Sequence, residues 1–264
     1  MIIGIAQVDM AWEDSISNMT KFEKLIRKAA ENGVELVLFP EMALTGFTMD
    51  IHKLSLSESD IVSWIRRLSL DNNISIGFGY AVKVDEKGKN KYIIVSNEGN
   101  TLASYTKIHP FSHGGEDKKY YSGNDISSCL INEFKITPFI CYDLRFPEIF
   151  QIASKESHII TVAASWPKER EEHWLTLLKA RAIENQCYII GINRVGVGGS
   201  LEYNGGSIFV NPNGEILNEL GSEEMLIIRE ININDIAKVR HKLDTKKDRR
   251  EELYTIMNKK TGGS

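Results

Sequence analysis

Cysteine and excess positive charge are both scarce in this 264-residue chain, and each shortage excludes a class of protein. The three cysteines, Cys129, Cys141 and Cys187, are odd in number and widely spaced. No CxxC motif and no Cys/His pair at ligand spacing occurs, so we expect neither a disulfide framework nor a structural zinc site. The formal net charge is −4 and no basic stripe is present, so we expect no nucleic-acid partner.

Long apolar runs are also missing. No run approaches the roughly 18 residues that a membrane-spanning helix requires. The first ten residues, MIIGIAQVDM, lack the basic region of a signal peptide and lead directly into a segment predicted to be helical. We therefore expect a cytoplasmic protein with no membrane partner.

The composition that remains is typical of a globular protein. Hydrophobic residues make up 42% of the chain and charged residues 26%, which are ordinary proportions for a folded domain. The chain is long enough to bury a substantial core, and no linker or break in composition divides it. We predict a single domain over residues 1–264, with a highly charged C-terminal tail from about Leu243.

Apolar strands and amphipathic helices alternate in the first half. The predicted strands are residues 2–8, 36–39, 74–84, 91–96 and 101–105. The predicted helices are residues 19–30 and 59–70. Ser17 or Asn18 is the expected cap of the first helix and Gly33 its end. Turns at residues 86–88 and 97–100 predict that the last three strands form an antiparallel meander.

The second half repeats this pattern. The predicted strands are residues 134–141, 158–164, 187–193, 207–210 and 226–231, and the predicted helices are residues 147–155, 169–186 and a last one from Asn234. The second of these helices has one apolar face, formed by Trp174, Leu177, Leu178, Ala182 and Ile183. Residues 196–206 are a glycine-rich loop, and residues 207–231 complete a second meander. The loop lacks the strand-to-helix context of a nucleotide-binding motif.

Each half therefore predicts a mixed sheet, because helices alternate with buried strands and antiparallel strands follow. Two such sheets can stack face to face with the helices outside. The predicted fold class is α/β, a four-layer α-β-β-α sandwich of two stacked mixed sheets.

Cys141 stands where a buried strand changes into a helix, in the segment FICYDLRFPE. Backbone N–H groups are unpaired at such a junction, so they lower the pKa of a thiol and can stabilise an oxyanion. A buried structural cysteine is the ordinary alternative. The three polar residues Tyr142, Asp143 and Arg145 directly after an apolar strand favour a functional site.

Two further charged residues stand at strand ends, where α/β folds gather catalytic groups. Glu41 follows the strand LVLFP in an apolar setting that is unusual for a carboxylate, and Lys107 follows TLASYT among aromatic residues. Solvated surface charges are the ordinary alternative for both. Together with Cys141 they would supply a nucleophile, a proton shuttle and an oxyanion-stabilising cation.

Three segments together resemble the signatures of the nitrilase superfamily of carbon–nitrogen hydrolases: FPEMALTGF, YTKIHPF and FICYDLRFPE, in this order and spacing. The resemblance extends from Ile3 to about Ile231. It implies a Glu41–Lys107–Cys141 triad, the α-β-β-α fold, homodimers or larger homo-oligomers, and neither a cofactor nor a metal. The segment ASWPKEREEHWLTLLKARAIENQCYIIGINRVG is most similar to the omega-amidase branch, which includes 2-oxoglutaramate amidases.

The resemblance also implies roles for supporting residues. Glu116 matches the second glutamate that many superfamily members place beside the lysine. Tyr142 is expected to offer its backbone N–H to the oxyanion, and Trp166 to form a wall of the pocket. His109 and His113 have no necessary role in this chemistry and are expected to lie in surface loops.

Arg145 allows two interpretations. With Asp143 and Glu148 it can form a buried ion-pair cluster that fixes the turn after Cys141, or it can bind a substrate carboxylate, since its fork suits a planar anion. The other candidate cations for a substrate carboxylate are Lys107, Lys168, Arg170 and Arg194.

The expected partner is thus a small-molecule amide with a terminal carboxylate. Two alternatives stay open: another amidase of the superfamily, acting on deaminated glutathione or N-carbamoyl amino acids, and a binding scaffold without catalysis. The presence of all three triad residues argues against the scaffold.

Overall fold

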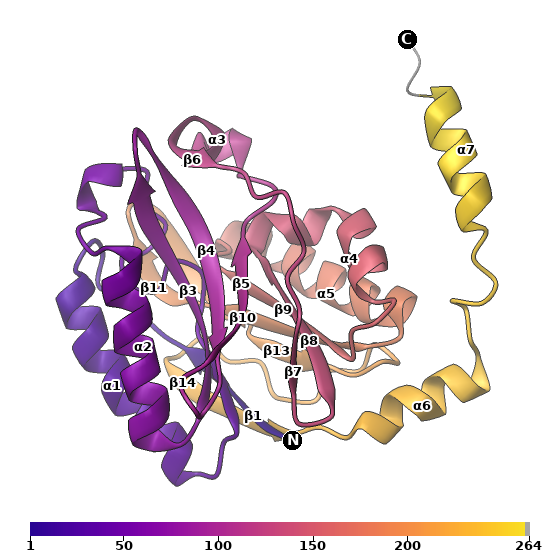
Figure 1. Cartoon of the computed structure of the whole chain (residues 1–264), viewed down its shortest axis with the longest axis horizontal. Helices are drawn as coiled ribbons and strands as arrows, with labels where there is room; N and C mark the ends of the chain where they lie inside the picture. Colours follow the sequence, from indigo (N-terminus) through magenta and orange to yellow (C-terminus); the bar gives the residue numbers. More distant parts are fainter. Residues whose placement is uncertain (262–264) are drawn as a thin grey trace.

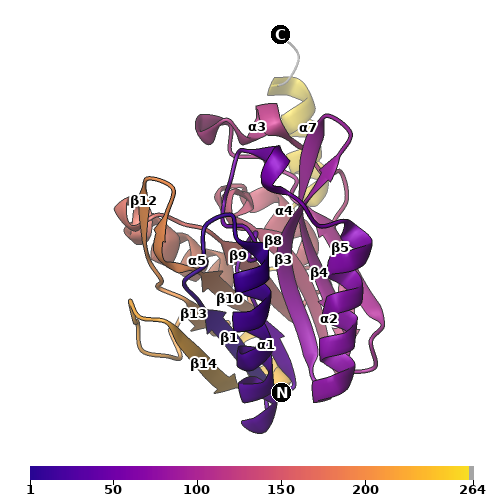
Figure 2. The same cartoon turned by 90° about the vertical axis from the view of Figure 1, so that its left-hand side faces the viewer.

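Residues 1–261, which the computed structural model describes, are arranged as helix, sheet, sheet and helix layers (Figure 1, Figure 2). The predicted fold class is confirmed. The two sheets lie face to face, with helices α1 and α2 outside the first and α4 and α5 outside the second (Figure 1). Among these residues, no helix is long and apolar enough to cross a membrane.

The first sheet has seven strands, and its central strands β1, β2 and β3 are parallel. In spatial order the strands are β14 (Met225–Glu230), β1 (Ile2–Gln7), β2 (Leu36–Leu38), β3 (Ser75–Val84), β4 (Lys87–Val95) and β5 (Thr101–Thr106), with β6 (Tyr120–Tyr121) beside β4. Its covering helices are α1 (Ser15–Glu31) and α2 (Glu58–Asn72). The turn η1 (Ile51–Lys53) precedes α2, and η2 (Ser112–Gly114) with α3 (Glu116–Lys119) follows β5.

The second sheet has five strands, with β8, β9 and β10 parallel at its centre. In order they are β13 (Ile208–Val210), β10 (Tyr188–Asn193), β9 (Ile159–Ala164), β8 (Phe134–Ile140) and β7 (Cys129–Ile131). The covering helices are α4 (Pro147–Ala153) and α5 (Glu171–Asn185), preceded by the turns η3 (Cys141–Arg145) and η4 (Lys168–Arg170).

Strand β2 shows how alternation builds the layers. Leu36 and Leu38 point into the core between the sheets, whereas Val37 and Phe39 belong to the core under α1 and α2. The Phe39 ring lies 5.1 Å from that of Phe22 on α1. Because side chains of a strand alternate between faces, a short apolar run can serve two cores. The rigid strand ends that result position the residues that follow.

Two local predictions about helices are wrong. The cap of α1 is Asp14, whose side chain accepts a hydrogen bond from the Ser17 N–H at 3.0 Å. Asn18 is instead buried, and its side chain donates to the Leu44 carbonyl. On α5, Ile183 is 54% exposed. The buried face of this helix runs at four-residue spacing through Trp174, Leu178 and Ala182, and Ile183 lies just outside that face.

The predicted second meander is also wrong. Residues 195–204 form a separate hairpin of β11 (Val195–Gly198) and β12 (Leu201–Asn204). Strand β14 leaves the second half and pairs antiparallel with β1, so Ile227 faces Ile5 across the first sheet. Alternation predicts that residues 226–231 form a strand, but it does not tell which sheet edge the strand joins.

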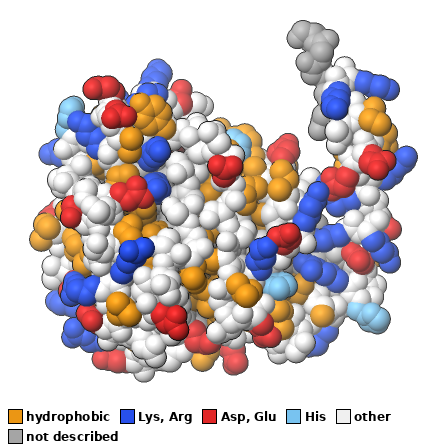
Figure 3. All heavy atoms as spheres, viewed as in Figure 1, with side chains coloured by type: hydrophobic (Ala, Val, Ile, Leu, Met, Phe, Trp, Pro, Cys, Tyr) orange, Lys and Arg blue, Asp and Glu red, His pale blue; other side chains and the backbone are white. Residues whose placement is uncertain are grey.

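Helix α6 (Ile233–Lys242) precedes the C-terminal tail, and the tail contains helix α7 (Glu251–Thr261). Helix α6 is capped by Asn232 rather than by the predicted Asn234. Helix α7 stands apart from the sheets (Figure 1), and its Tyr254 and Ile256 are exposed. On the face shown in Figure 3, basic and acidic side chains are interspersed over the two sheets.

Candidate active site

The three predicted catalytic residues follow the ends of strands from both sheets. Glu41 comes after β2, Lys107 after β5 and Cys141 after β8. Glu41 and Lys107 are 0% and 1% exposed, which ordinary surface charges are not. The surface alternative for these two residues is therefore wrong.

Lys107 lies between two carboxylates. Its Nζ is 2.8 Å from Glu41 Oε1 and 2.8 Å from Glu116 Oε2. Glu116 is fully buried and also accepts the Phe111 N–H at 2.6 Å. The second Glu41 oxygen, Oε2, accepts the backbone N–H of Ser165 at 2.9 Å. Glu41 is thereby fixed to both sheets, because Ser165 follows β9.

Asn90 completes this cluster and was missed by the sequence analysis. Its Nδ2 donates to Glu41 Oε1 at 2.7 Å and to Glu116 Oε1 at 2.9 Å. Its Oδ1 is buried and has no hydrogen-bond partner among the described residues. Asn90 lies on β4 at two-residue spacing from Tyr92 and Ile94, both buried against the other sheet. This spacing was the available signal that Asn90 points inward.

Burial and charge oppose each other in this cluster. Burial alone would lower the pKa of Lys107, but the carboxylates of Glu116 and Glu41 outweigh burial and raise that pKa. Burial raises the pKa of Glu116, and Lys107 counteracts this effect. Lys107 is therefore held in its charged form, as an oxyanion-stabilising cation must be.

Cys141 begins the turn η3 in a strained conformation, with φ at +46°. This left-handed region is uncommon for residues other than glycine and is found at functional sites where the surroundings hold the backbone. Here Asp143 holds it, because its Oδ2 accepts the Ile140 N–H at 3.0 Å and the Tyr105 hydroxyl at 2.7 Å. The other oxygen, Oδ1, accepts the His109 N–H at 3.0 Å.

The ion-pair cluster predicted around Asp143 is wrong in its partners. Asp143 bonds to His109 and Tyr105, and within residues 1–261 Arg145 forms no ion pair. Glu148 is exposed. Asp143 therefore ties the turn after Cys141 to the segment after Lys107. His109 is only partly exposed in this role, whereas His113 lies at the surface as predicted.

The expectation of a lowered thiol pKa is wrong as well. Burial raises the pKa of Cys141 well above its usual range, and the negative charge of Glu41 raises it further, while Lys107 and the Ser165 N–H oppose them. Helix α4 begins only at Pro147, too far away to dominate. Cys141 is thus a neutral thiol at rest that needs a base to remove its proton.

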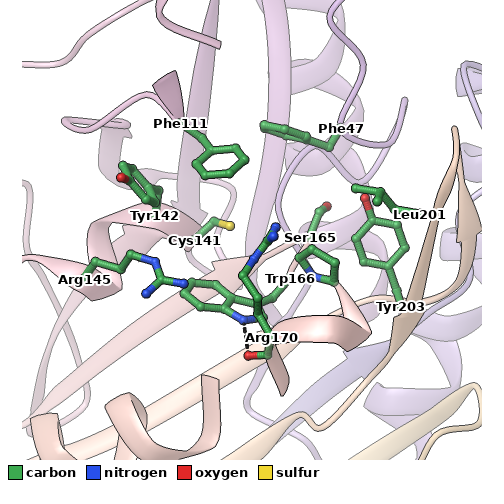
Figure 4. A pocket seen from close by; sticks show the side chains of 11 residues that line it. Phe47, Phe111, Cys141, Tyr142, Arg145, Ser165, Trp166, Arg170, Leu201 and Tyr203 are labelled. Carbon is green, nitrogen blue, oxygen red and sulfur yellow. Dashed lines mark hydrogen bonds between the residues drawn. The ribbon is translucent and has the colours of Figure 1, made fainter. Parts of the chain in front are cut away.

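A pocket with a volume of about 40 Å³ opens above Cys141 (Figure 4). Five of its eleven lining residues are aromatic, and they include Trp166, the predicted wall, and Tyr142. The full lining is Phe47, Phe111, Cys141, Tyr142, Arg145, Ser165, Trp166, Pro167, Arg170, Leu201 and Tyr203. Phe47, Leu201 and Tyr203 come from loops and the β12 hairpin strand, which no local pattern connects with Cys141. Within residues 1–261, no group of three or more His, Cys, Asp or Glu side chains could hold a metal ion.

The candidate cations for a substrate carboxylate separate into two groups. Arg145 and Arg170 line the pocket. Arg194 is buried elsewhere, 3.0 Å from Asp9, and Lys168 lies 3.1 Å from Glu202 at the surface. Lys107 donates to Glu41 and Glu116, which leaves one of its three ammonium N–H groups for an oxyanion.

The chain is similar to known proteins over most of its length. The family described as Carbon-nitrogen hydrolase matches residues 2–241. A 2-oxoglutaramate amidase from Bacillus subtilis is 32% identical over 258 residues, covering 96% of this chain and 98% of its own. The omega-amidase YafV from Yersinia enterocolitica is 33% identical over 215 residues, covering 81% of this chain and 82% of its own.

A solved structure gives the same result for the fold. A CN-hydrolase superfamily protein from Xanthomonas campestris, with an arsenic adduct in its active site, superposes with a TM-score of 0.88 at 28% identity. The match covers 94% of this chain and 97% of the other.

Proposed function

The chain belongs to the carbon-nitrogen hydrolase family of the nitrilase superfamily, and on this premise we propose that it is an omega-amidase. Its substrate is the terminal amide of a dicarboxylic acid, such as 2-oxoglutaramate, and its products are the free dicarboxylic acid and ammonia. The observation that supports this most is the buried Glu41–Lys107–Glu116 cluster beneath a pocket that contains Cys141. The similarity to the 2-oxoglutaramate amidase of Bacillus and the omega-amidase of Yersinia supports the substrate class.

The first half of the reaction acylates the cysteine. Glu41 takes the thiol proton while Cys141 Sγ attacks the amide carbon and the carbonyl becomes an oxyanion. Lys107 and the Tyr142 N–H stabilise that oxyanion. Protonated Glu41 then gives its proton to the leaving nitrogen, and ammonia departs from a thioester on Cys141.

The second half restores the enzyme. Glu41 takes a proton from water as the water oxygen attacks the thioester carbon, and the proton then returns to the departing sulfur. Glu116 keeps Lys107 charged through both steps and orients the amide. Because the thiol pKa is raised, the base is needed at the moment of attack.

Ammonia release from a substrate panel tests the proposal. We expect kcat/KM for succinamate or 2-oxoglutaramate to exceed that for butyramide, a neutral amide of equal length, by about 10²-fold or more. Near-equal values would contradict the omega-amidase assignment. Faster hydrolysis of deaminated glutathione or an N-carbamoyl amino acid would move the chain to another branch of the family.

We also propose a cytoplasmic homodimer. The free state of Cys129, Cys141 and Cys187 fits a reducing compartment. Helix α7, with Tyr254 and Ile256 exposed, is a suitable element to lock two copies together. Sedimentation at micromolar concentration should give a dimer, and a monomer would contradict this part of the proposal.

A further inference from the structure

The charged residues that line the pocket all have the same sign. Arg145 and Arg170 are the two, and the lining contains no acidic residue. Figure 4 shows them on two sides of Cys141, with the Arg170 guanidinium directed toward the middle of the pocket. Such a lining attracts an anion to the place where the amide must lie.

Neither arginine is neutralised by the protein. Within residues 1–261 no carboxylate lies within ion-pair distance of Arg145 or Arg170, although the other three candidates, Lys107, Lys168 and Arg194, each have at least one. A half-buried guanidinium without an anion is unfavourable, because it has lost water without gaining a partner. A bound carboxylate would supply that partner through two parallel hydrogen bonds.

The two guanidinium groups differ in how they are held. Arg145 lies over the Trp166 ring, with 4.8 Å from its Cζ to the ring centroid, and its Nη2 is 3.4 Å from His173 Nδ1. Arg170 lies over the Phe111 ring at 5.6 Å, and among the described residues its guanidinium has no hydrogen-bond partner.

The backbone of Arg170, in contrast to its side chain, is fixed. Its carbonyl accepts the Trp166 Nε1–H at 2.7 Å, and its N–H donates to the Pro167 carbonyl at 3.0 Å. The start of the side chain is therefore held in place, while all five N–H donors of the guanidinium remain available to a ligand. Among the described residues, Arg170 therefore has more donors free for an anion than Arg145, whose Nη2 is engaged by His173.

We propose that Arg170 is the residue that selects the substrate carboxylate, with Arg145 as its partner on the opposite side of Cys141. This inference rests on the proposed omega-amidase function and adds the location of its specificity. The amide end of the substrate lies at Cys141 and Lys107, and the carboxylate end lies toward Arg170. A neutral amide leaves both guanidinium groups without an anion.

The test compares Arg170→Gln with Lys168→Gln, measuring kcat/KM for succinamate and for butyramide in each. Lys168 is a matched control. It is a cation in the same turn η4 as Arg170, but it does not line the pocket. We expect Arg170→Gln to reduce the succinamate-to-butyramide ratio by about 10²-fold, and Lys168→Gln to leave the ratio as in the wild type. Arg170→Lys keeps the charge without the fork, and it should give an intermediate ratio.

The outcomes separate this inference from the proposed function. A wild-type enzyme that prefers succinamate and an Arg170→Gln enzyme with the same preference would overturn the role of Arg170 and leave the omega-amidase function intact. Equal losses on both substrates would indicate a structural role and overturn the inference too. A wild-type enzyme without any preference for succinamate would overturn both. If Arg170→Gln does not fold, the Arg170→Lys ratio decides, and a wild-type ratio in that variant contradicts the proposal.

Discussion

The charged residues at the bottom of the pocket are paired with one another, whereas those at its mouth are not. At the bottom, Glu41 and Glu116 are buried, and each lies 2.8 Å from the buried ammonium of Lys107. At the mouth, Arg145 and Arg170 are half-buried, and within residues 1–261 neither has an acidic partner. Charges that are already satisfied by the protein can act on the reacting atoms, whereas unpaired charges are available to choose the ligand. We therefore propose that the bottom of the pocket carries out the reaction and that the mouth selects the substrate.

The largest effect is expected at the nucleophile. Cys141→Ala should abolish ammonia release from every substrate, since no other group can form the thioester. The matched control is Cys129→Ala: burial raises the pKa of Cys129 to about 12, so it is inert, and its loss should reduce the melting temperature more than activity. Turnover in the Cys141→Ala protein would show that the bottom of the pocket is not where the reaction occurs.

Alkylation sharpens the same point without a mutation. Iodoacetamide should modify Cys141 first, because Cys129 and Cys187 are buried. Only the thiolate reacts, and the pKa of Cys141 is raised, so the thiolate fraction increases with pH through the neutral range. The alkylation rate should still be rising at about pH 9, above the usual thiol pKa. A plateau below neutral pH would indicate a resting thiolate and contradict the need for Glu41.

A smaller but still large effect is expected at Lys107. Lys107→Met keeps the stem but removes the oxyanion donor, so kcat should fall roughly 10²–10³-fold. The fall should be equal for succinamate and butyramide, because Lys107 belongs to the bottom of the pocket. Lys91→Met is the control, since Lys91 pairs with Glu58 away from the pocket. A variant that kept more than about a tenth of the wild-type kcat would contradict the role.

The smallest effect is expected at Asn90. Asn90→Leu removes two charge-assisted hydrogen bonds, and we expect kcat to fall about tenfold. The hydrogen bond from Asn90 lowers the pKa of Glu116, which burial raises, so its removal raises that pKa further. Glu116 must be ionised to pair with Lys107, and the acidic limb of the pH profile should therefore move to higher pH.

The control for Asn90 is Asn97→Leu, in the exposed turn after the same strand. A melting curve separates lost stability from lost activity in both variants. An unshifted acidic limb in Asn90→Leu would show that Asn90 does not control the charge of Glu116.

The sequence predicted the residues whose signal is local. Glu41 and Cys141 each follow an apolar strand directly, and Lys107 ends a strand of a meander, so strand ends alone suggested them. Asn90 was missed because the lysines on either side of it are typical of a solvent-exposed strand. Its inward direction depends on continuing the alternation backwards from Tyr92.

Other features depend on packing over long distances. Nothing in the sequence separates Arg170 from Arg194, but the fold places Arg170 in the pocket lining and bonds Arg194 to Asp9. The pairing of β14 with β1 and the raised pKa of Cys141 likewise require the folded chain. Local patterns therefore located the proposed catalytic residues, but they did not single out the arginine proposed to select the substrate.

The central claim is that the bottom of the pocket forms a thioester on Cys141, and acyl transfer to hydroxylamine tests it most directly. Succinamate and the monomethyl ester of succinic acid share an acyl group but have different leaving groups. If both pass through the same thioester, the ratio of hydroxamate to succinate at a given hydroxylamine concentration must be identical for the two. We predict identical ratios. Ratios that differ between the amide and the ester would contradict a common covalent intermediate.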